Sequence, residues 1–227
     1  MQDVSTRRPG RPARLSREGI LRAAVAIADE GGLESLTMGR IGAQVGAEAM
    51  SLYRHVRNKD DLLDGVVDLV YAEIELPVAD AGWKPSMRHR AISARDVLRG
   101  HPWAIGLMES RSQPGPANMA HHDAVLAVLL GAGFSSATAT HAYNVLDSYI
   151  YGFALQEVSL PFGTQEEIAA LGERIFENRQ DTTYPNLRRV TADLIAAGFA
   201  YADEFEFGLD LILDGLERMH AGSIGGR

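Results

Sequence analysis

Apolar residues recur along the chain with the spacing of amphipathic α-helices. The first stripe follows Ser16, a candidate N-cap, and ends at Gly31-Gly32. No stretch alternates apolar and polar residues as a half-buried strand would. The pattern therefore predicts an all-α fold. The further helices are expected at about 37–45, 49–55, 59–75, 86–99, 102–110, 118–132, 136–157, 165–178 and 203–221.

The same pattern divides the chain into three parts. Residues 1–15 contain arginines among prolines and glycines without an apolar period, which predicts an extended arm. Residues 16–60 contain two short helices joined at Gly46, a helix-turn-helix arrangement. Residues 61–222 are expected to form a larger helical domain.

Charge is distributed unevenly between these parts. The 227 residues carry a net charge of -8. Residues 1–60 contain ten Lys or Arg and seven Asp or Glu, a net +3, which leaves 12 minus 23, or -11, for the remainder. Any contact with a polyanion is therefore expected in the first quarter of the chain, where counterion release favours binding.

Composition excludes several classes of protein. The chain has no cysteine, so disulfides and thiolate metal sites are ruled out. Its apolar runs, such as 125–130, are much shorter than the ~20 residues that span a bilayer. The basic N-terminus does not resemble a secretory signal. We therefore expect a soluble cytoplasmic protein that contacts no membrane.

The two short helices match a known mode of DNA recognition. In a helix-turn-helix the second helix enters the major groove, and here the second helix is polar and aromatic rather than apolar. Many small helical domains contain such a pair, so the geometry alone leaves other roles open.

A longer motif is more specific. Leu36-Thr37-Met38 leads to Gly46, and the string SLYRHVRNKDDLL follows at 51–63. Over about residues 16–65 the chain resembles the DNA-binding region of the TetR family. The resemblance implies a homodimer that binds double-stranded operator DNA through residues 16–60, and repression that is relieved by a small-molecule effector bound in residues 61–222.

The resemblance also implies roles for individual side chains. Thr37 at a helix N-terminus, Tyr53 and Lys59 would contact phosphates, and Arg54 could read a guanine. Tyr53 could instead be a half-buried core residue and His55 a solvated one. The residues expected at the DNA are Thr37, Arg40, Ala49, Met50, Ser51, Tyr53, Arg54, His55 and Lys59.

The basic arm has two interpretations. Arg7 and Arg11 could enter an A·T-rich minor groove, as basic arms containing Gly-Arg-Pro can. A solubilising tail explains the same composition equally well.

A second resemblance covers the rest of the chain. His101-Pro102-Trp103, Gly133-Phe134 and the segments 146–157 and 207–217 resemble the regulatory domain of the tetracycline repressor subgroup. This implies that helices 136–157 and 203–221 pair with their symmetry mates in a four-helix bundle. The expected contacts there are Gly152, Ala154, Gly208 and Gly215 as small residues, and Leu146, Leu209, Ile212 and Leu216 as apolar ones.

An effector pocket is expected in the same region, with apolar walls and a few polar anchors. A Met or an aromatic residue at helical spacing is more often a plain core residue. Glu75 stands where tetracycline repressors carry a drug-contacting histidine, and Met108 lies near the place of their magnesium-binding histidine. Both differences argue against sensing of tetracycline with magnesium. The candidates are Trp103, Met108, Tyr143, Asp147, Tyr151 and Phe153.

Metal binding and catalysis are not expected. Neighbouring residues on a helix point about 100° apart, so His121-His122-Asp123 cannot converge on one ion and is interpreted as a solvated face. No Ser-His-Asp arrangement, phosphate loop or zinc motif supports an enzyme, and no cofactor is expected. An architectural protein that binds DNA without operator preference is the remaining alternative.

Overall fold

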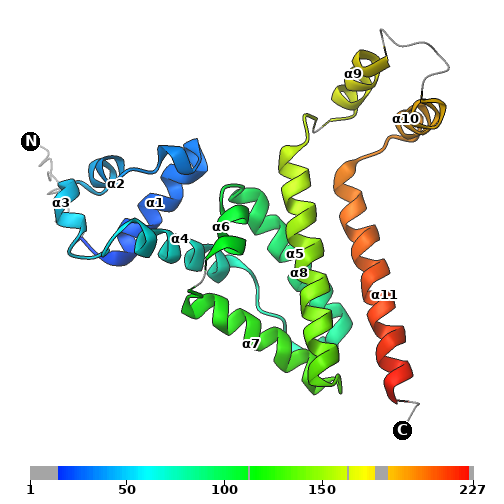
Figure 1. Ribbon diagram of the computed structural model, residues 1–227, viewed down its shortest axis with the longest axis horizontal. Coiled ribbons are helices and arrows are strands. Elements are labelled where there is room, and N and C mark those ends of the chain that lie inside the picture. The colour runs from blue at the N-terminus through cyan, green and yellow to red at the C-terminus, as the bar shows by residue number, and fades with distance from the viewer. Residues whose placement is uncertain (1–14, 112, 163, 177–183, 225–227) are drawn as a thin grey trace, which may run out of the picture.

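The structure, a computed structural model, describes residues 15–111, 113–162, 164–176 and 184–224 (Figure 1). Within these ranges every regular element is a helix, which confirms the all-α prediction. The helices are α1 Arg17–Gly31, α2 Met38–Val45, α3 Ala49–Leu52, α4 Lys59–Glu73, α5 Trp83–Gly100, α6 Ala104–Ser110, α7 Pro116–Gly131, α8 Ser136–Ser159, α9 Gln165–Phe176, α10 Pro185–Ala197 and α11 Glu204–Ile224, with 3-10 turns at Leu33–Ser35, Ala79–Ala81 and Tyr201–Asp203.

Two expectations about helices were wrong. Helix α10 was not predicted, because a proline usually interrupts a helix, whereas Pro185 occupies the first helical turn, where its missing N–H costs nothing. Helix α3 is a single turn that ends at Leu52 rather than His55. The remaining expected helices are present, with ends that differ by a few residues.

Helices α1, α2, α3 and the first half of α4 enclose their own core, and we call this part the headpiece. Ile20, Ile41, Leu52 and Val66 are completely buried in it. The predicted caps hold: the side chains of Ser16, Thr37 and Asn58 each accept a hydrogen bond from the backbone N–H three residues later. These caps stabilise the helix starts by about 1 kcal/mol each.

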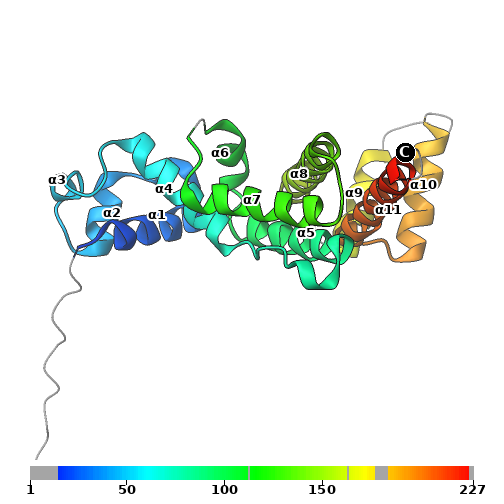
Figure 2. The same cartoon turned by 90° about the horizontal axis from the view of Figure 1, so that it is seen from below.

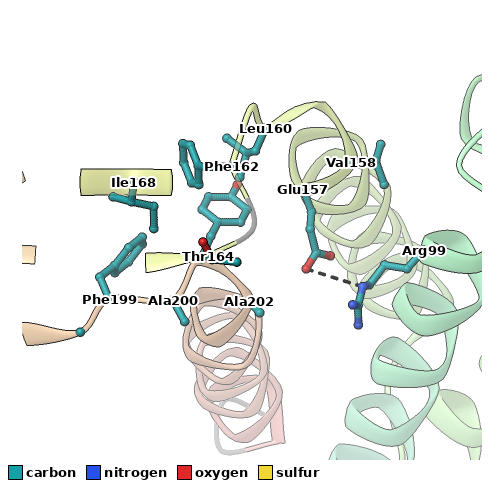
Figure 3. A pocket seen from close by; sticks show the side chains of 12 residues that line it. Arg99, Glu157, Val158, Leu160, Phe162, Thr164, Ile168, Phe199, Ala200 and Ala202 are labelled. Carbon is teal, nitrogen blue, oxygen red and sulfur yellow. Dashed lines mark ion pairs between the residues drawn. The ribbon is translucent and has the colours of Figure 1, made fainter. Parts of the chain in front are cut away.

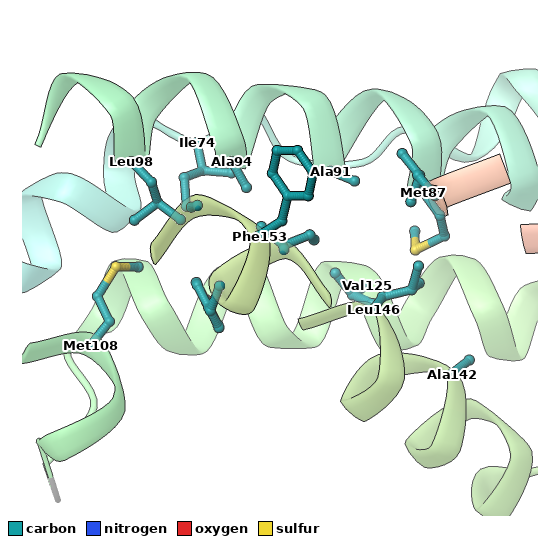
Figure 4. Close-up of a cluster of buried hydrophobic side chains, with 14 of the residues drawn as sticks. Ile74, Met87, Ala91, Ala94, Leu98, Met108, Val125, Ala142, Leu146 and Phe153 are labelled. Atoms are coloured by element: carbon teal, nitrogen blue, oxygen red, sulfur yellow. The ribbon is translucent and has the colours of Figure 1, made fainter. Parts of the chain in front are cut away.

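A second core joins the rest of α4 to α5, α6, α7, α8 and α11 (Figure 4). Met87, Leu98, Val125 and Leu146 are fully buried there. Helices α9 and α10 pack against each other and stand apart from this body, and α10 contributes no buried residue (Figure 1). Among the described residues, no helix has the length and apolarity that spanning a membrane requires.

Helix α4 connects the headpiece to the second core. Its Asp68 accepts hydrogen bonds from the backbone N–H groups of Ala117 and Asn118, at 2.9 and 3.1 Å, and so caps the N-terminus of α7. Its Asp64 pairs with Arg111, which follows α6, at 2.6 Å. The headpiece lies at one end of an elongated molecule (Figure 2). Helix α4 attaches it to the second core, and the contacts of Asp64 and Asp68 fix this helix to its neighbours.

Candidate DNA-binding surface and effector cavity

Glycines set the close approach between α2 and α3. Gly46 ends α2 with φ 67°, a left-handed conformation that other residues adopt at a cost. A Cβ on Gly42 would lie 2.6 Å from the carbonyl oxygen of Ala47. The turn can therefore pass directly over α2 only because residue 42 has no side chain.

The turn presents α3 to solvent. Leu52 and Val56 are buried and fix α3 on the headpiece core, while Met50 and Tyr53 are 77% and 46% exposed. Arg54 is also exposed. A large apolar side chain left in water beside an aromatic and a guanidinium group is typical of a surface that a partner covers.

The other predicted DNA contacts surround this turn. Ala49, Ser51 and His55 are half-buried, and Lys59 is exposed in the first turn of α4. Thr37 is occupied as the cap of α2, and Arg40 donates a 3.4 Å hydrogen bond to the carbonyl of Ser35. Arg7 and Arg11 lie outside the described residues.

Asp61 holds this surface together, and the sequence analysis did not identify it. Its carboxylate accepts the backbone N–H of Arg57 at 2.8 Å and both guanidinium nitrogens of Arg17 at 3.0 and 3.1 Å. The Arg57 N–H, followed by the Arg17 guanidinium, lowers the pKa of Asp61. Arg17 also donates to the carbonyl of His55, so α1, the turn after α3 and α4 are fixed relative to one another.

A cavity of about 700 Å³ opens between α4, α6, α7 and α8. This volume falls in the range that holds drug-sized ligands. Hydroxyl, amide and carboxyl groups alternate with apolar surface on its wall. The lining residues are Tyr71, Ile105, Gly106, Asn118, Tyr143, Asn144, Asp147, Ser148, Tyr151, Gly152 and Leu155.

The structure brings together three of the six predicted pocket residues, Tyr143, Asp147 and Tyr151. Met108 and Phe153 belong to the second core, where the Phe153 ring packs against Phe205 and Tyr201 at 5.1 and 4.8 Å. Trp103 lies between the two cores and packs against both. The lining carries more polar groups than the predicted apolar walls with a few polar anchors, and it includes residues of α4 and α7 as well.

A buried ion pair lies behind the cavity wall. Arg90 is 1% exposed, and its guanidinium contacts Asp147 Oδ1 at 2.6 Å and donates to His121 Nε2 at 3.2 Å. Burial, Arg90 and His122 lower the pKa of His121 to about 3, which keeps it neutral. The expectation of a solvated face at 121–123 was therefore wrong for His121, which is 1% exposed.

Phenol groups line the same cavity. The hydroxyls of Tyr71 and Tyr151 lie 3.2 Å apart. Burial and the carboxylate of Asp147 raise the pKa values of Tyr143 and Tyr151, so both remain protonated. Within the described residues, no group of three His, Asp or Glu side chains is placed to hold a metal ion. The cavity therefore offers neutral hydrogen-bonding groups beside one buried ion pair.

A second hollow, of about 470 Å³, lies where the end of α8 meets α9 and the segment before α11 (Figure 3). Leu160, Phe162 and Phe199 give it apolar walls, and Arg99 and Glu157 stand at one side. Glu157 is already paired with Arg95 at 2.5 Å. The arrangement combines apolar packing between loops with an ion pair between helices.

Four of the eight residues predicted at a dimer interface of α8 and α11 are covered within the single chain. Leu209 and Leu216, like Leu146 and Ala154 on α8, are buried within the single chain. Gly208 lies against Tyr149 of the same chain. The exposed apolar residues of these two helices are Val145, Leu155, Val158, Phe207, Leu211 and Met219.

These features define a class of protein. An exposed helix-turn-helix, set by Gly42 and Gly46 and joined through one helix to a helical body with a ligand-sized cavity, is the arrangement of a DNA-binding regulator. Comparison with known sequences specifies the class further. Residues 20–66 match the profile of bacterial regulatory proteins of the tetR family, and residues 76–220 match the tetracyclin repressor-like C-terminal domain.

Individual relatives are similar over nearly the whole chain. The HTH-type transcriptional repressor DrrR1 of Streptomyces coeruleorubidus is 33% identical over 226 residues, 93% of this chain and 81% of the relative. Tetracycline repressor protein class A from transposon 1721 of Escherichia coli is 30% identical over 208 residues, 90% and 92% of the two chains. The structure of ActR from Streptomyces coelicolor in complex with actinorhodin superposes with a TM-score of 0.76 at 27% identity, covering 92% and 99%.

The chain belongs to the TetR family of bacterial transcriptional regulators. The family consists of regulators rather than enzymes, which excludes the enzyme alternative.

Proposed function

We propose that the chain is a cytoplasmic repressor that binds a palindromic operator as a homodimer and releases it when a small molecule occupies the cavity at Tyr143 and Tyr151. Residues 16–60 bind DNA in this proposal, and residues 61–222 bind the effector and dimerise. The observation that carries it is the exposure of Met50 on α3 and of Tyr53 and Arg54 in the turn directly after it, while Leu52 fixes α3 on the headpiece core.

Dimerisation is supported by the exposed apolar side chains of α11. Phe207 and Leu211, one helical turn apart, are 64% and 57% exposed on the long helix beside α8. A single recognition helix binds one half-site, and two half-sites about 34 to 36 Å apart are needed for strong binding. A second copy of this chain, joined through α8 and α11, supplies the other recognition helix.

Alanine variants separate phosphate contacts from base readout. We expect Lys59→Ala to weaken binding to all DNA sequences and to lower the salt slope by about one phosphate per subunit. Tyr53→Ala should also weaken binding uniformly. Arg54→Ala should lose ~1 to 3 kcal/mol of discrimination at one base pair of each half-site, because a bidentate contact to guanine is lost.

The measurement uses genomic DNA fragments that the purified protein retrieves, followed by titration of single-base variants at several salt concentrations. Arg22→Ala is the matched control, since Arg22 is exposed on α1 and pairs with Glu18. An unchanged ranking of operator variants for Arg54→Ala would refute its role in base reading. Equal affinity for all fragments would favour the architectural alternative.

The effector we propose is a rigid ring compound with several hydrogen-bonding substituents. Tyr71, Tyr143 and Tyr151 offer hydroxyls and flat ring surfaces, and Asn118 and Asn144 offer amides at the same wall. Actinorhodin, the ligand named in the ActR structure, is a suitable first probe.

A cavity-filling substitution tests the site. Gly106 lines the cavity and has open space where a Cβ would stand, so Gly106→Phe should abolish binding of actinorhodin in calorimetry. Gly131→Phe is the control, because Gly131 also has open space but lies at the end of α7. Bound probe should lower operator affinity about 5- to 150-fold. Equal probe binding by Gly106→Phe and the control would exclude this cavity.

A further inference from the structure

The segment between α5 and α6 is bonded directly to the headpiece. His101 Nδ1 lies 2.7 Å from Asp29 Oδ1, near the end of α1, and His101 Nε2 lies 3.0 Å from Glu73 Oε2, at the end of α4. Trp103 Nε1 donates to the same Asp29 oxygen at 2.7 Å. Since both ring nitrogens face carboxylates, only the protonated imidazole can donate to both.

The same segment reaches the cavity within three residues. Trp103 packs against both hydrophobic cores. Ile105 and Gly106, which follow it in the first turn of α6, line the cavity at Tyr143. A shift of α6 must therefore move or break the bonds to Asp29, unless the headpiece moves with it.

We propose that Asp29 is the positioning residue through which α6 controls the headpiece: with the charged form of His101 and with Trp103 it holds the arrangement that binds operator. This inference rests on the proposed function of operator binding. Asp29 does not line the cavity and is not among the residues expected at the DNA, so it acts through the orientation of α1.

The bond depends on the protonation of His101. Burial alone would lower the pKa of His101, but hydrogen bonds and charge from Asp29 and Glu73 outweigh it and raise the pKa. The facing charged groups are Asp29 of α1 and Glu73 of α4; described residues of α5 and α6 form no ion pair with His101. The bond is complete below the ordinary pKa of histidine and is lost as pH rises through the raised value.

Operator affinity as a function of pH tests the proposal with the full chain and a retrieved genomic fragment. We expect the affinity of the wild type to fall about fivefold as pH rises through the raised pKa of His101. Because one proton binds to each subunit, operator affinity can change by at most about tenfold per pH unit for each subunit. His101→Gln and Asp29→Asn should bind with a much flatter profile, because the first lacks the imidazole and the second lacks the carboxylate through which its charge acts on α1.

His55 requires a control, since it is a second histidine and borders the DNA surface. The comparison is therefore repeated in a His55→Gln background. There, adding His101→Gln should flatten the pH profile of operator affinity as much as it does in the wild type. NMR titration of the imidazole signals should show a lower pKa for His101 in Asp29→Asn than in the wild type. A pH profile left unchanged by His101→Gln, or an unchanged pKa of His101 in Asp29→Asn, would overturn the inference. Failure to retain any genomic fragment at any pH would instead contradict the proposed function.

Discussion

Replacing Asp147 with leucine should destabilise the protein by about 3 to 5 kcal/mol, whether or not an effector is present. The substitution leaves the guanidinium of Arg90, 1% exposed, without its carboxylate. His121 cannot compensate, because it is a neutral acceptor at Nε2. The measurement is urea unfolding followed by circular dichroism, in which the midpoint should fall while the slope stays constant.

The matched controls distinguish a buried charge from a lost contact. Asp123→Leu removes an exposed carboxylate from the neighbouring helix α7 and should change stability by less than about 0.5 kcal/mol. The double variant Arg90→Met with Asp147→Leu removes both charges and should recover most of the loss. Equal destabilisation by the single and the double variant would show that the ion pair is not the cause.

This prediction bears on how the cavity is studied. Asp147 lines the cavity and is therefore an obvious residue to substitute in search of an effector contact. Lost effector binding in such a variant would report partial unfolding as readily as a lost contact. Gly106 and Tyr151 are the better positions, since neither takes part in the ion pair.

The headpiece was predictable because its signals are local. The caps at Ser16, Thr37 and Asn58 and the turn at Gly46 depend only on neighbours within a few residues, and all four are present in the structure. Asp61 was missed because Arg17, which its carboxylate fixes to the rest of the headpiece, lies 44 residues away on α1. A long-range pair of this kind leaves no periodic signal in one sequence.

The regulatory part was less predictable, because a helix with apolar residues on two faces does not reveal which face is covered within the chain. On α11, Leu209 and Leu213 are buried, while Leu211 between them is 57% exposed. Both sets have helical spacing, so periodicity accepts either. A further side of α11 forms ion pairs with α5: Lys84 lies 2.7 Å from Asp214, and Arg88 lies 2.8 Å from Asp210.

Disrupting the exposed face of α11 should have the largest effect on DNA binding. In the proposed symmetric interface, Leu211 of one subunit lies close to the same helix of its partner, so Leu211→Glu places like charges together and removes apolar contact. The protein should change from two chains to one in light scattering. Operator affinity should fall about 100- to 10,000-fold, because the second headpiece no longer binds as part of the same molecule.

A mixture of variants separates a charge effect at the interface from misfolding. Leu211→Glu and Leu211→Lys should each be monomeric, while an equimolar mixture should form a dimer and regain operator binding, since opposite charges then meet across the axis. Leu130→Glu, at an exposed position of α7, is the control and should remain dimeric. Dimers of Leu211→Glu at micromolar concentration, or unaltered operator binding by a monomeric variant, would place the interface on another surface.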